Sequence, residues 1–226
     1  ARLWHPNRSE CLCTFTTSAV VSSVDFHPVD DRFFVTGGLD GKVRLWNIAA
    51  RRVQAINDVP GVITTVAFSA SGAAVCVGTH AGAVLTFACS ETLRYVGAVT
   101  VKSVAAKGAQ ASKVTGIQPI KLNAVASEAE AEAEYMTITS NDSRVRIYAI
   151  GSRRLISRFK SASYMNRSSQ IRATASHDAQ YIISGSEDAS IHVWSLAPTA
   201  PLLSNLLSGI KRNKSILKQG GADAGD

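Results

Sequence analysis

An aspartate recurs at a fixed distance from an aromatic residue, and it is the side chain most clearly placed to do chemistry. Asp40, Asp142 and Asp188 each stand six residues before the aromatic residue that closes an apolar run. A carboxylate in a tight turn accepts backbone N–H groups and holds the turn closed. We therefore predict a structural role for these three aspartates, and a looser turn in the copy that has Ala81 at this position.

A glycine-containing segment superficially resembles a phosphate-binding loop. That loop requires four residues between its glycines, a Ser or Thr after its lysine, and a following helix. In the segment Gly37–Lys42, three residues separate Gly37 from Gly41, and Val43 follows the lysine. The flanking residues favour two strands joined by a turn, so we reject a nucleotide-binding role for this segment.

Ser184, Asp188 and His192 have the residue types of a hydrolytic triad. No GxSxG turn accompanies them, and the alternation of a strand together with the intervening turn would scatter their side chains. The sequence also lacks the clustered ligands of a metal site. We therefore predict no catalytic residue, no bound metal and no cofactor, and we do not expect an enzyme.

The elements that must position these residues recur along the chain. Intervals of 42, 41, 61 and 46 residues separate the aromatic residues that close successive copies: Trp4, Trp46, Phe87, Tyr148 and Trp194. A period near 42 with this signature is typical of WD repeats, in which each repeat contributes four strands to one blade of a β-propeller. We therefore predict an all-β chain of about four and a half blades, a fragment of a seven-bladed ring of about 300 residues.

The expected domain boundaries follow from this period. Residues 1–15 form part of one blade, and repeats follow at about 20–56, 62–100, 113–159 and 169–196. Only three strands are expected in the last repeat, of which the first spans 169–175. In the strand at 42–47, Val43 and Leu45 are predicted to face inward, with Lys42 and Arg44 outward. Residues 197–226 are basic, rich in Gly and Ala and poor in aromatics, and we expect them to be disordered.

Two insertions interrupt the period. Residues 102–112 are small, basic and Gly-containing, which predicts a flexible loop. The segment Ser127–Glu134 alternates Ala with Glu after its first residue, and both residue types favour helix over strand. Its simplest interpretation is a solvated acidic bulge, and its functional interpretation is an acidic docking segment.

A candidate partner-binding rim follows from the links that connect one repeat to the next. Tyr, Met and Arg residues on a rigid scaffold are typical interface anchors. A positive rim that carries an aromatic residue would suit an acidic protein segment, whereas the simpler alternative is a mobile linker with incidental residues. The candidate rim residues are Lys102, Lys107, Lys113, Lys160, Tyr164 and Arg167.

Composition excludes several classes of protein. The net charge of +7 is a mild basic bias that permits an acidic partner or an anionic surface without demanding nucleic acid. No apolar run is long enough for a transmembrane helix, and no secretory signal is recognisable at the N-terminus. The chain begins inside a repeat, so we expect a fragment. Four cysteines without metal-ligand spacing are expected to be buried free thiols in a reducing compartment.

Several residue runs are more specific than the repeat pattern, among them Glu10–Cys13, Leu39–Lys42, Lys113–Ile117, Ser140–Arg144 and Ser168–Ile171. They resemble the propeller of the rabphilin-eleven-like WD-repeat proteins over most of residues 1–196. This resemblance implies a non-catalytic cytoplasmic scaffold linked to Rab-type small GTPases and endosomal membrane traffic, peripheral on the membrane. In that family the GTPase-binding segment lies ahead of the propeller. The alternative from charge alone is a propeller that binds nucleic acid or chromatin.

Overall fold

The structure is a computed structural model that describes residues 1–101, 112–121 and 133–196. Within these ranges every regular element is a β-strand, and none is a helix. Three antiparallel sheets have four strands each, a fourth sheet has three, and a two-stranded hairpin precedes them. These sheets confirm the predicted all-β fold class.

The strands of each sheet are consecutive in the chain. The hairpin pairs β1 (Arg2–Trp4) with β2 (Cys11–Thr14). The first sheet comprises β3 (Val21–Phe26), β4 (Phe33–Gly38), β5 (Lys42–Asn47) and β6 (Arg52–Asp58). The second comprises β7 (Ile63–Phe68), β8 (Ala74–Thr79), β9 (Ala83–Cys89) and β10 (Leu93–Thr100). The third comprises β11 (Val114–Ile120), β12 (Tyr135–Ser140), β13 (Arg144–Ala149) and β14 (Leu155–Phe159), and the fourth comprises β15 (Thr174–Ala175), β16 (Tyr181–Gly185) and β17 (Ile191–Ser195).

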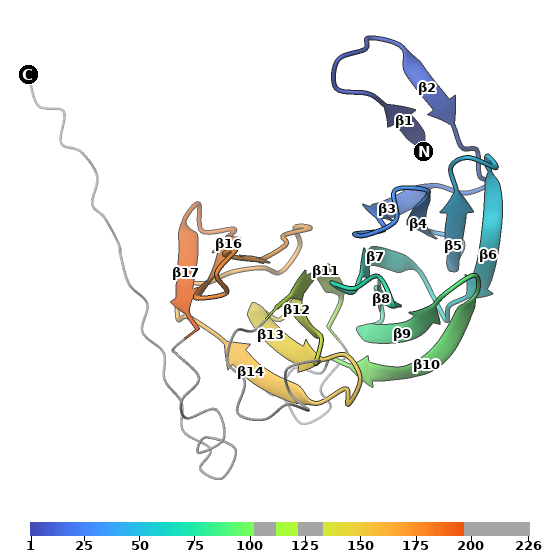
Figure 1. Ribbon diagram of the computed structural model, residues 1–226. Coiled ribbons are helices and arrows are strands. Elements are labelled where there is room, and N and C mark those ends of the chain that lie inside the picture. Colours follow the sequence, from blue (N-terminus) through green and yellow to red (C-terminus); the bar gives the residue numbers. More distant parts are fainter. Residues whose placement is uncertain (102–111, 122–132, 197–226) are drawn as a thin grey trace, which may run out of the picture.

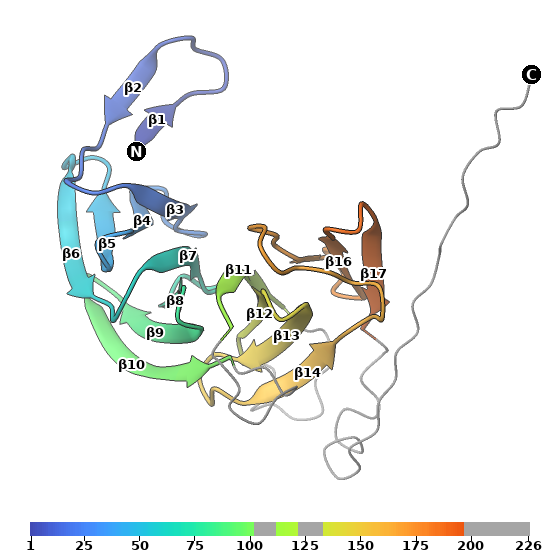
Figure 2. The same cartoon turned by 180° about the vertical axis from the view of Figure 1, so that it is seen from behind.

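The sheets follow one another around an open arc, as Figures 1 and 2 show from opposite sides. The first strands β3, β7 and β11 lie toward the concave side of the arc, and the last strands β6, β10 and β14 lie on its outside. Each sheet therefore forms one blade, and the arc is an open arrangement of β-propeller blades.

Hydroxyl side chains join the inner strands of neighbouring blades. The pairing of β3 with β4 and of β7 with β8 shifts register next to Ser22 and Thr64, respectively. The Ser22 hydroxyl donates to the carbonyl oxygen of Ile63 at 2.7 Å, and the Thr64 hydroxyl donates to that of Val114 at 2.6 Å. A bulge leaves its residue outside the backbone ladder, and in β3 and β7 the hydroxyl of that residue reaches a carbonyl oxygen of the next blade as well as one of its own blade.

Apolar layers fill the spaces between consecutive sheets. One layer lies between each pair of adjacent blades, and another lies between the first blade and the hairpin. Residue pairs that mark these layers are Val35 with Phe68, Cys76 with Ile117, Ile147 with Ile182, and Phe15 with Trp46. Burial of a large aliphatic or aromatic side chain stabilises a fold by about 1.5–3 kcal/mol, so these layers hold the blades together.

The turn between the second and third strands of each blade needs one residue with left-handed backbone geometry. Gly41 and Gly82 supply it in the first two blades, with φ of 72° and 79°. Ser143 and Ala189 occupy the same position in the third and fourth blades, with φ of 56° and 62°. Glycine adopts this geometry without steric cost, whereas a residue with a Cβ does not.

The predicted outward orientation of Arg44 is wrong. Arg44 is only 7% exposed. Val43 and Leu45, on the other face of β5, are buried as predicted. Both faces of a propeller blade are covered by neighbouring elements, so strand alternation does not separate a buried face from a solvated one.

The first strand of the last repeat is much shorter than predicted. Strand β15 holds two residues instead of the expected 169–175. The backbone N–H of Ala173 donates to the Thr139 hydroxyl at 2.9 Å, so the segment before β15 bonds to the preceding blade. The expected disordered tail at 197–226, nearly all of the loop at 102–112 and most of the Ala/Glu insertion lie outside the described residues.

The cysteines are less uniformly buried than expected. All four are free thiols, but Cys11 is exposed, and Cys13 and Cys89 are half-buried. Only Cys76 is buried, and burial raises the pKa of its thiol to about 12. Cys11 lies at the start of β2, in the hairpin at the end of the arc (Figure 1).

The first and last blades each expose apolar side chains. On β3, Val24 and Phe26 are 53% and 54% exposed, although the alternate residues of this strand contact the second blade. At the other end, Tyr181 and Ile183 of β16 and Ile191, at the start of β17, are also exposed. Apolar side chains are therefore exposed on the first blade, beside the hairpin, and on the last blade.

Candidate functional site

The turn aspartates accept hydrogen bonds from their own hairpins. The Asp40 carboxylate accepts the backbone N–H of Lys42 at 3.2 Å and the Arg44 guanidinium at 2.5 Å. The Arg44 hydrogen bond holds the pKa of Asp40 below its ordinary value. The charged form is therefore favoured, and the carboxylate ties the turn to the third strand of its blade.

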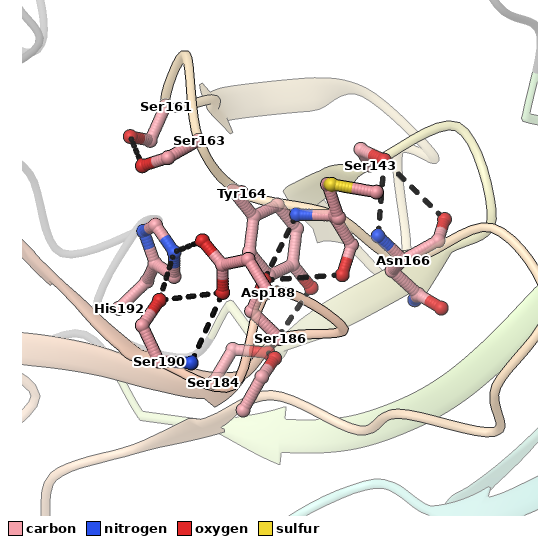
Figure 3. Close-up of polar contacts among 12 residues, drawn as sticks. Ser143, Ser161, Ser163, Tyr164, Asn166, Ser184, Ser186, Asp188, Ser190 and His192 are labelled. Carbon is pink, nitrogen blue, oxygen red and sulfur yellow. Dashed lines mark hydrogen bonds and ion pairs between the residues drawn. The ribbon is translucent and has the colours of Figure 1, made fainter.

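Asp188 makes the equivalent contacts in the last blade, as Figure 3 shows. It accepts the backbone N–H of Ser190 at 3.1 Å and the hydroxyl of the same residue at 2.6 Å. His192 Nε2 lies 3.3 Å from its other oxygen and 2.9 Å from the Ser190 hydroxyl. The Ser190 hydroxyl lies between Asp188 and His192 and donates to the Asp188 carboxylate. This cluster of three side chains therefore holds the turn and does not present a nucleophile.

Asp142 is bound by side chains of β12 and β13. It accepts the Ser140 hydroxyl at 2.7 Å and the Arg144 guanidinium at 2.9 Å, and it also pairs with Arg146. The Asp142 and Arg146 side chains are only 4% and 2% exposed, so this is a buried ion pair. Burial alone would raise the pKa of Asp142, but the hydrogen bonds from Arg146 and Ser140 outweigh it and hold the pKa below its ordinary value.

The partner of each turn aspartate was missed by sequence reasoning. It stands four residues after the acid, on the third strand of the blade: Arg44, Arg146 and His192. The second blade has neither member, because Ala81 and Leu85 occupy the two positions. The sequence does carry a signal for this pair, because a basic residue stands four positions after the aspartate in each repeat that has the aspartate and is absent from the repeat that lacks it.

Tyr164 is not part of the exposed rim that we predicted. It is only 2% exposed, and its hydroxyl hydrogen-bonds the Ser184 hydroxyl at 3.0 Å. Its ring packs edge-on against Trp194, with the centroids 5.1 Å apart, and lies beside His192 (Figure 3). Tyr164 lies in a link without periodicity, so the sequence pattern could not show that the ring fills the space beside the last blade.

The link between β14 and β15 ties three blades together. Asn166 is buried, and its side-chain amide donates to the Thr115 hydroxyl at 2.9 Å. Its backbone N–H donates to the Ser143 hydroxyl at 3.0 Å (Figure 3). Gln170 donates to the carbonyl oxygens of Thr115 at 2.9 Å and Thr64 at 3.3 Å. The link therefore fixes the positions of the second and third inner strands.

Glu187 joins this link to the turn between β16 and β17. One of its carboxylate oxygens accepts three consecutive backbone N–H groups: Arg167 at 3.0 Å, Ser168 at 2.8 Å and Ser169 at 2.7 Å. These backbone bonds lower the pKa of Glu187 to about 2. Three convergent N–H groups form an anion-binding nest, which here holds a carboxylate of the same chain.

The other predicted rim residues are only partly placed. Lys160 and Arg167 are exposed, and Lys113 is half-buried, while Lys102 and Lys107 lie outside the described residues. The carbonyl oxygen of Lys113 accepts the backbone N–H of Asn141, and the same turn contacts Asn166 through Ser143. Lys113 and Arg167 thus lie on the same side of the arc, and their role in partner binding stays a prediction.

Neither a metal site nor a membrane-spanning helix is present in the described part of the chain. No group of three or more His, Cys, Asp or Glu side chains is placed to bind a metal there. No helix in the same ranges is long and apolar enough to cross a membrane.

Consecutive four-stranded antiparallel sheets with an aspartate in the turn before the third strand define a WD-repeat β-propeller. The chain belongs to this class: residues 9–47 and 166–195 match the family described as "WD domain, G-beta repeat". It is 39% identical over 197 residues to "WD repeat-containing protein 44" of Xenopus laevis, an alignment that covers 86% of this chain and 20% of the relative.

Other relatives show the same relationship. An uncharacterized WD repeat-containing protein of Schizosaccharomyces pombe is 28% identical over 193 residues, with 85% of this chain and 32% of the relative covered. The chain thus spans a third or less of the length of these relatives. The structure of U3-55K superposes with a TM-score of 0.61 at 12% identity, covering 80% of this chain and 50% of that one. This last likeness shows the fold alone.

Proposed function

We propose that the chain is a non-catalytic protein-interaction scaffold in Rab GTPase-linked endosomal membrane traffic. WD-repeat proteins generally act as protein-interaction scaffolds, and the repeats of this chain are established by its sheets and its family match. The observation that carries the proposal is the alignment of 197 residues at 39% identity with a WD-repeat relative. The link to Rab-type GTPases rests on the resemblance of such runs as Ser140–Arg144 and Ser168–Ile171 to the rabphilin-eleven-like proteins.

The partner that this scaffold would bind is an acidic protein segment. Lys160 and Arg167 are exposed on the link between the third and fourth blades, and Lys113 lies on the same side of the arc as Arg167. Charge complementarity steers association and fixes the orientation of a partner. The scaffold would act in the cytoplasm, at the periphery of endosomal membranes, with GTPase binding supplied by another segment of the longer protein.

Proximity labelling in cells tests this proposal. The chain, fused to a labelling enzyme, is compared with a variant that carries Lys113→Gln, Lys160→Gln and Arg167→Gln. We expect endosomal traffic proteins to be enriched around the parent chain and their labelling to fall at least about fivefold around the variant, because charge loss at a rim slows association. Equal labelling by both chains would contradict the rim, and an absence of endosomal proteins would contradict the pathway.

Nucleic-acid binding is the competing function, and the net charge of +7 is the observation that favours it. It predicts that binding of the purified chain to a nonspecific DNA duplex falls steeply with salt concentration. We expect negligible binding at about 150 mM salt, close to the physiological ionic strength. Strong and steeply salt-dependent binding, together with nuclear proteins in the labelling experiment, would replace the scaffold proposal.

A further inference from the structure

A single carboxylate, that of Glu187, joins the turn after β16 to an exposed part of the preceding link, residues 167–169. We call this contact the latch. The Glu187 oxygen that accepts the three backbone N–H groups of 167–169 also accepts the Ser168 hydroxyl at 3.3 Å. Arg167, Ser168 and Ser169 are all exposed and lie outside any strand. The latch is therefore built from groups that an enzyme in solution can reach.

Backbone bonds extend the same latch on both of its sides. The Glu187 N–H donates to the carbonyl oxygen of Met165 at 2.9 Å, and the Met165 N–H donates to the Ser186 hydroxyl at 2.9 Å. The carboxylate and these two bonds join the segments 165–169 and 186–187 side by side. Loss of the carboxylate contact would leave this junction with the contacts of Met165, which include a hydrogen bond from the Ser186 hydroxyl to its carbonyl oxygen at 3.2 Å.

The latch is continuous with the contacts that tie the blades together. Asn166 lies between the latched residues Met165 and Arg167, and it bonds to Thr115 in the third blade. Gln170 follows the nest directly and bonds to the second and third inner strands. A change in the conformation of 165–169 therefore acts on the seam between the last two described blades.

A covalent modification of the Ser168 hydroxyl would change the contacts of this latch. A phosphoryl group on its oxygen would remove one donor to Glu187 and place a charge of about −2 next to that carboxylate. Phosphate oxygens are strong acceptors, and a nest of consecutive N–H groups binds phosphate well. The phosphoryl group would compete for the same three N–H groups that now hold Glu187.

We propose that Ser168 is a phosphorylation site and that its phosphoryl group displaces Glu187 from the nest at 167–169, which opens the junction between this link and the β16–β17 turn. In the modification the Ser168 oxygen attacks the γ-phosphorus of a nucleoside triphosphate. A new oxygen–phosphorus bond forms, the bond to the β-phosphate oxygen breaks, and the nucleoside diphosphate leaves. The hydroxyl proton passes to a base of the kinase.

Mass spectrometry tests the site of modification. The chain is purified from yeast cells treated with a phosphatase inhibitor and compared with the Ser168→Ala and Ser169→Ala variants. We expect one phosphoryl group on Ser168 in the parent and in Ser169→Ala, and none at that peptide in Ser168→Ala. An unmodified Ser168, or phosphate confined to Ser169, would overturn the assignment.

Hydrogen exchange tests the switch, with phosphoserine installed at position 168 during synthesis. The amides of Met165 and Glu187 should exchange about tenfold faster than in the parent, because their junction opens more often. Phosphoserine at Ser163 is the matched control, since that exposed residue contacts Ser161 and not Glu187. Unchanged exchange with phosphoserine 168, or equal acceleration by the control, would overturn the switch.

The titration of Glu187 gives an independent readout. NMR of its carboxyl carbon should report a pKa near 2 in the unmodified chain, because the backbone N–H groups stabilise the carboxylate. With phosphoserine at 168 we expect the pKa to rise to at least about 4, its ordinary range for glutamate, through loss of these bonds and like-charge repulsion. A pKa that stays near 2 would show that Glu187 remains in the nest.

Discussion

At the scale of single residues, the aspartate that recurs before each third strand is a partner of a basic side chain as well as a turn residue. The pair is buried in the third blade and absent from the second, where Ala81 and Leu85 replace it. An apolar pair can therefore take the same place in a blade of the same chain. Removing both members of a buried ion pair is often nearly neutral, whereas removing one leaves an uncompensated charge.

We expect Asp142→Ala to lower the free energy of unfolding by about 3–5 kcal/mol, because it leaves the Arg146 guanidinium buried without its carboxylate. The triple variant Asp142→Ala with Arg144→Ala and Arg146→Leu, which copies Ala81, Ala83 and Leu85 of the second blade and also removes the second arginine bound to Asp142, should recover most of this loss. Urea denaturation followed by circular dichroism measures both. Asp40→Ala is the control: its carboxylate is more exposed, and it should cost only about 1 kcal/mol.

The same pair has a defined pH dependence. The pKa of Asp142 is lowered in the folded chain, so its contribution to stability is fully present above the unfolded pKa of about 4 and is lost as the pH falls through the folded value. The stability difference between the parent and Asp142→Ala should therefore shrink below about pH 4. An equal loss in the single and triple variants, or a difference independent of pH, would refute the buried ion pairs of Asp142 as the cause.

At the scale of elements, the hairpins follow from local sequence, but their turns are not equally well built. The turn position with left-handed geometry is glycine in two blades and Ser143 or Ala189 in the other two. The strain of an L-residue at positive φ is about 1–2 kcal/mol, partly offset because glycine has more freedom in the unfolded chain. The turn of the last blade therefore carries strain at Ala189 that a glycine would relieve.

We expect Ala189→Gly to raise the free energy of unfolding by about 0.5–1 kcal/mol, because it relieves this strain. Thermal unfolding of the two chains measures the difference. Gly41→Ala is the converse control and should be destabilising, since a Cβ there would lie 2.8 Å from the Val59 carbonyl oxygen. A lower melting temperature for Ala189→Gly would contradict the interpretation of φ as strain.

The strand segments of the first three blades were predictable from the alternation and spacing of apolar residues. The link before β15 was not, because Gln170 and Ala173 bond to blades that lie 55 and 34 residues earlier in the chain. A residue pattern reports local periodicity, and it does not report which distant carbonyl group an amide will meet. For the same reason Tyr164 was assigned to a solvated rim although its ring is buried beside Trp194.

At the scale of the whole molecule, the first and last blades both expose apolar side chains. Val24 and Phe26 of the first blade and Tyr181 and Ile183 of the last blade are exposed. Exposed apolar faces and open strand edges promote association between molecules. The isolated chain should therefore bind copies of itself through these exposed apolar residues of the first and last blades.

We expect sedimentation velocity to show concentration-dependent oligomers of the 226-residue chain at micromolar concentration. A variant with Phe26→Lys and Ile183→Lys should shift the distribution toward monomer, because both substitutions place a charge among the exposed apolar residues of the first and last blades. Tyr95→Lys is the matched control, since Tyr95 is equally exposed but lies on the outer strand β10. A monodisperse, cooperatively unfolding parent monomer would contradict this prediction.

The sequence alone determined the repeat, the all-β class, the four-strand blade and the turn aspartates, because each is specified by residues within about 42 positions of one another. Only the tertiary structure decided that Arg44 and Tyr164 are buried, that Glu187 occupies the nest at 167–169, and that the link ties three blades together. These features depend on which blades become neighbours. Burial and hydrogen bonding between blades arise from chain segments that are far apart in sequence, and no local pattern encodes them.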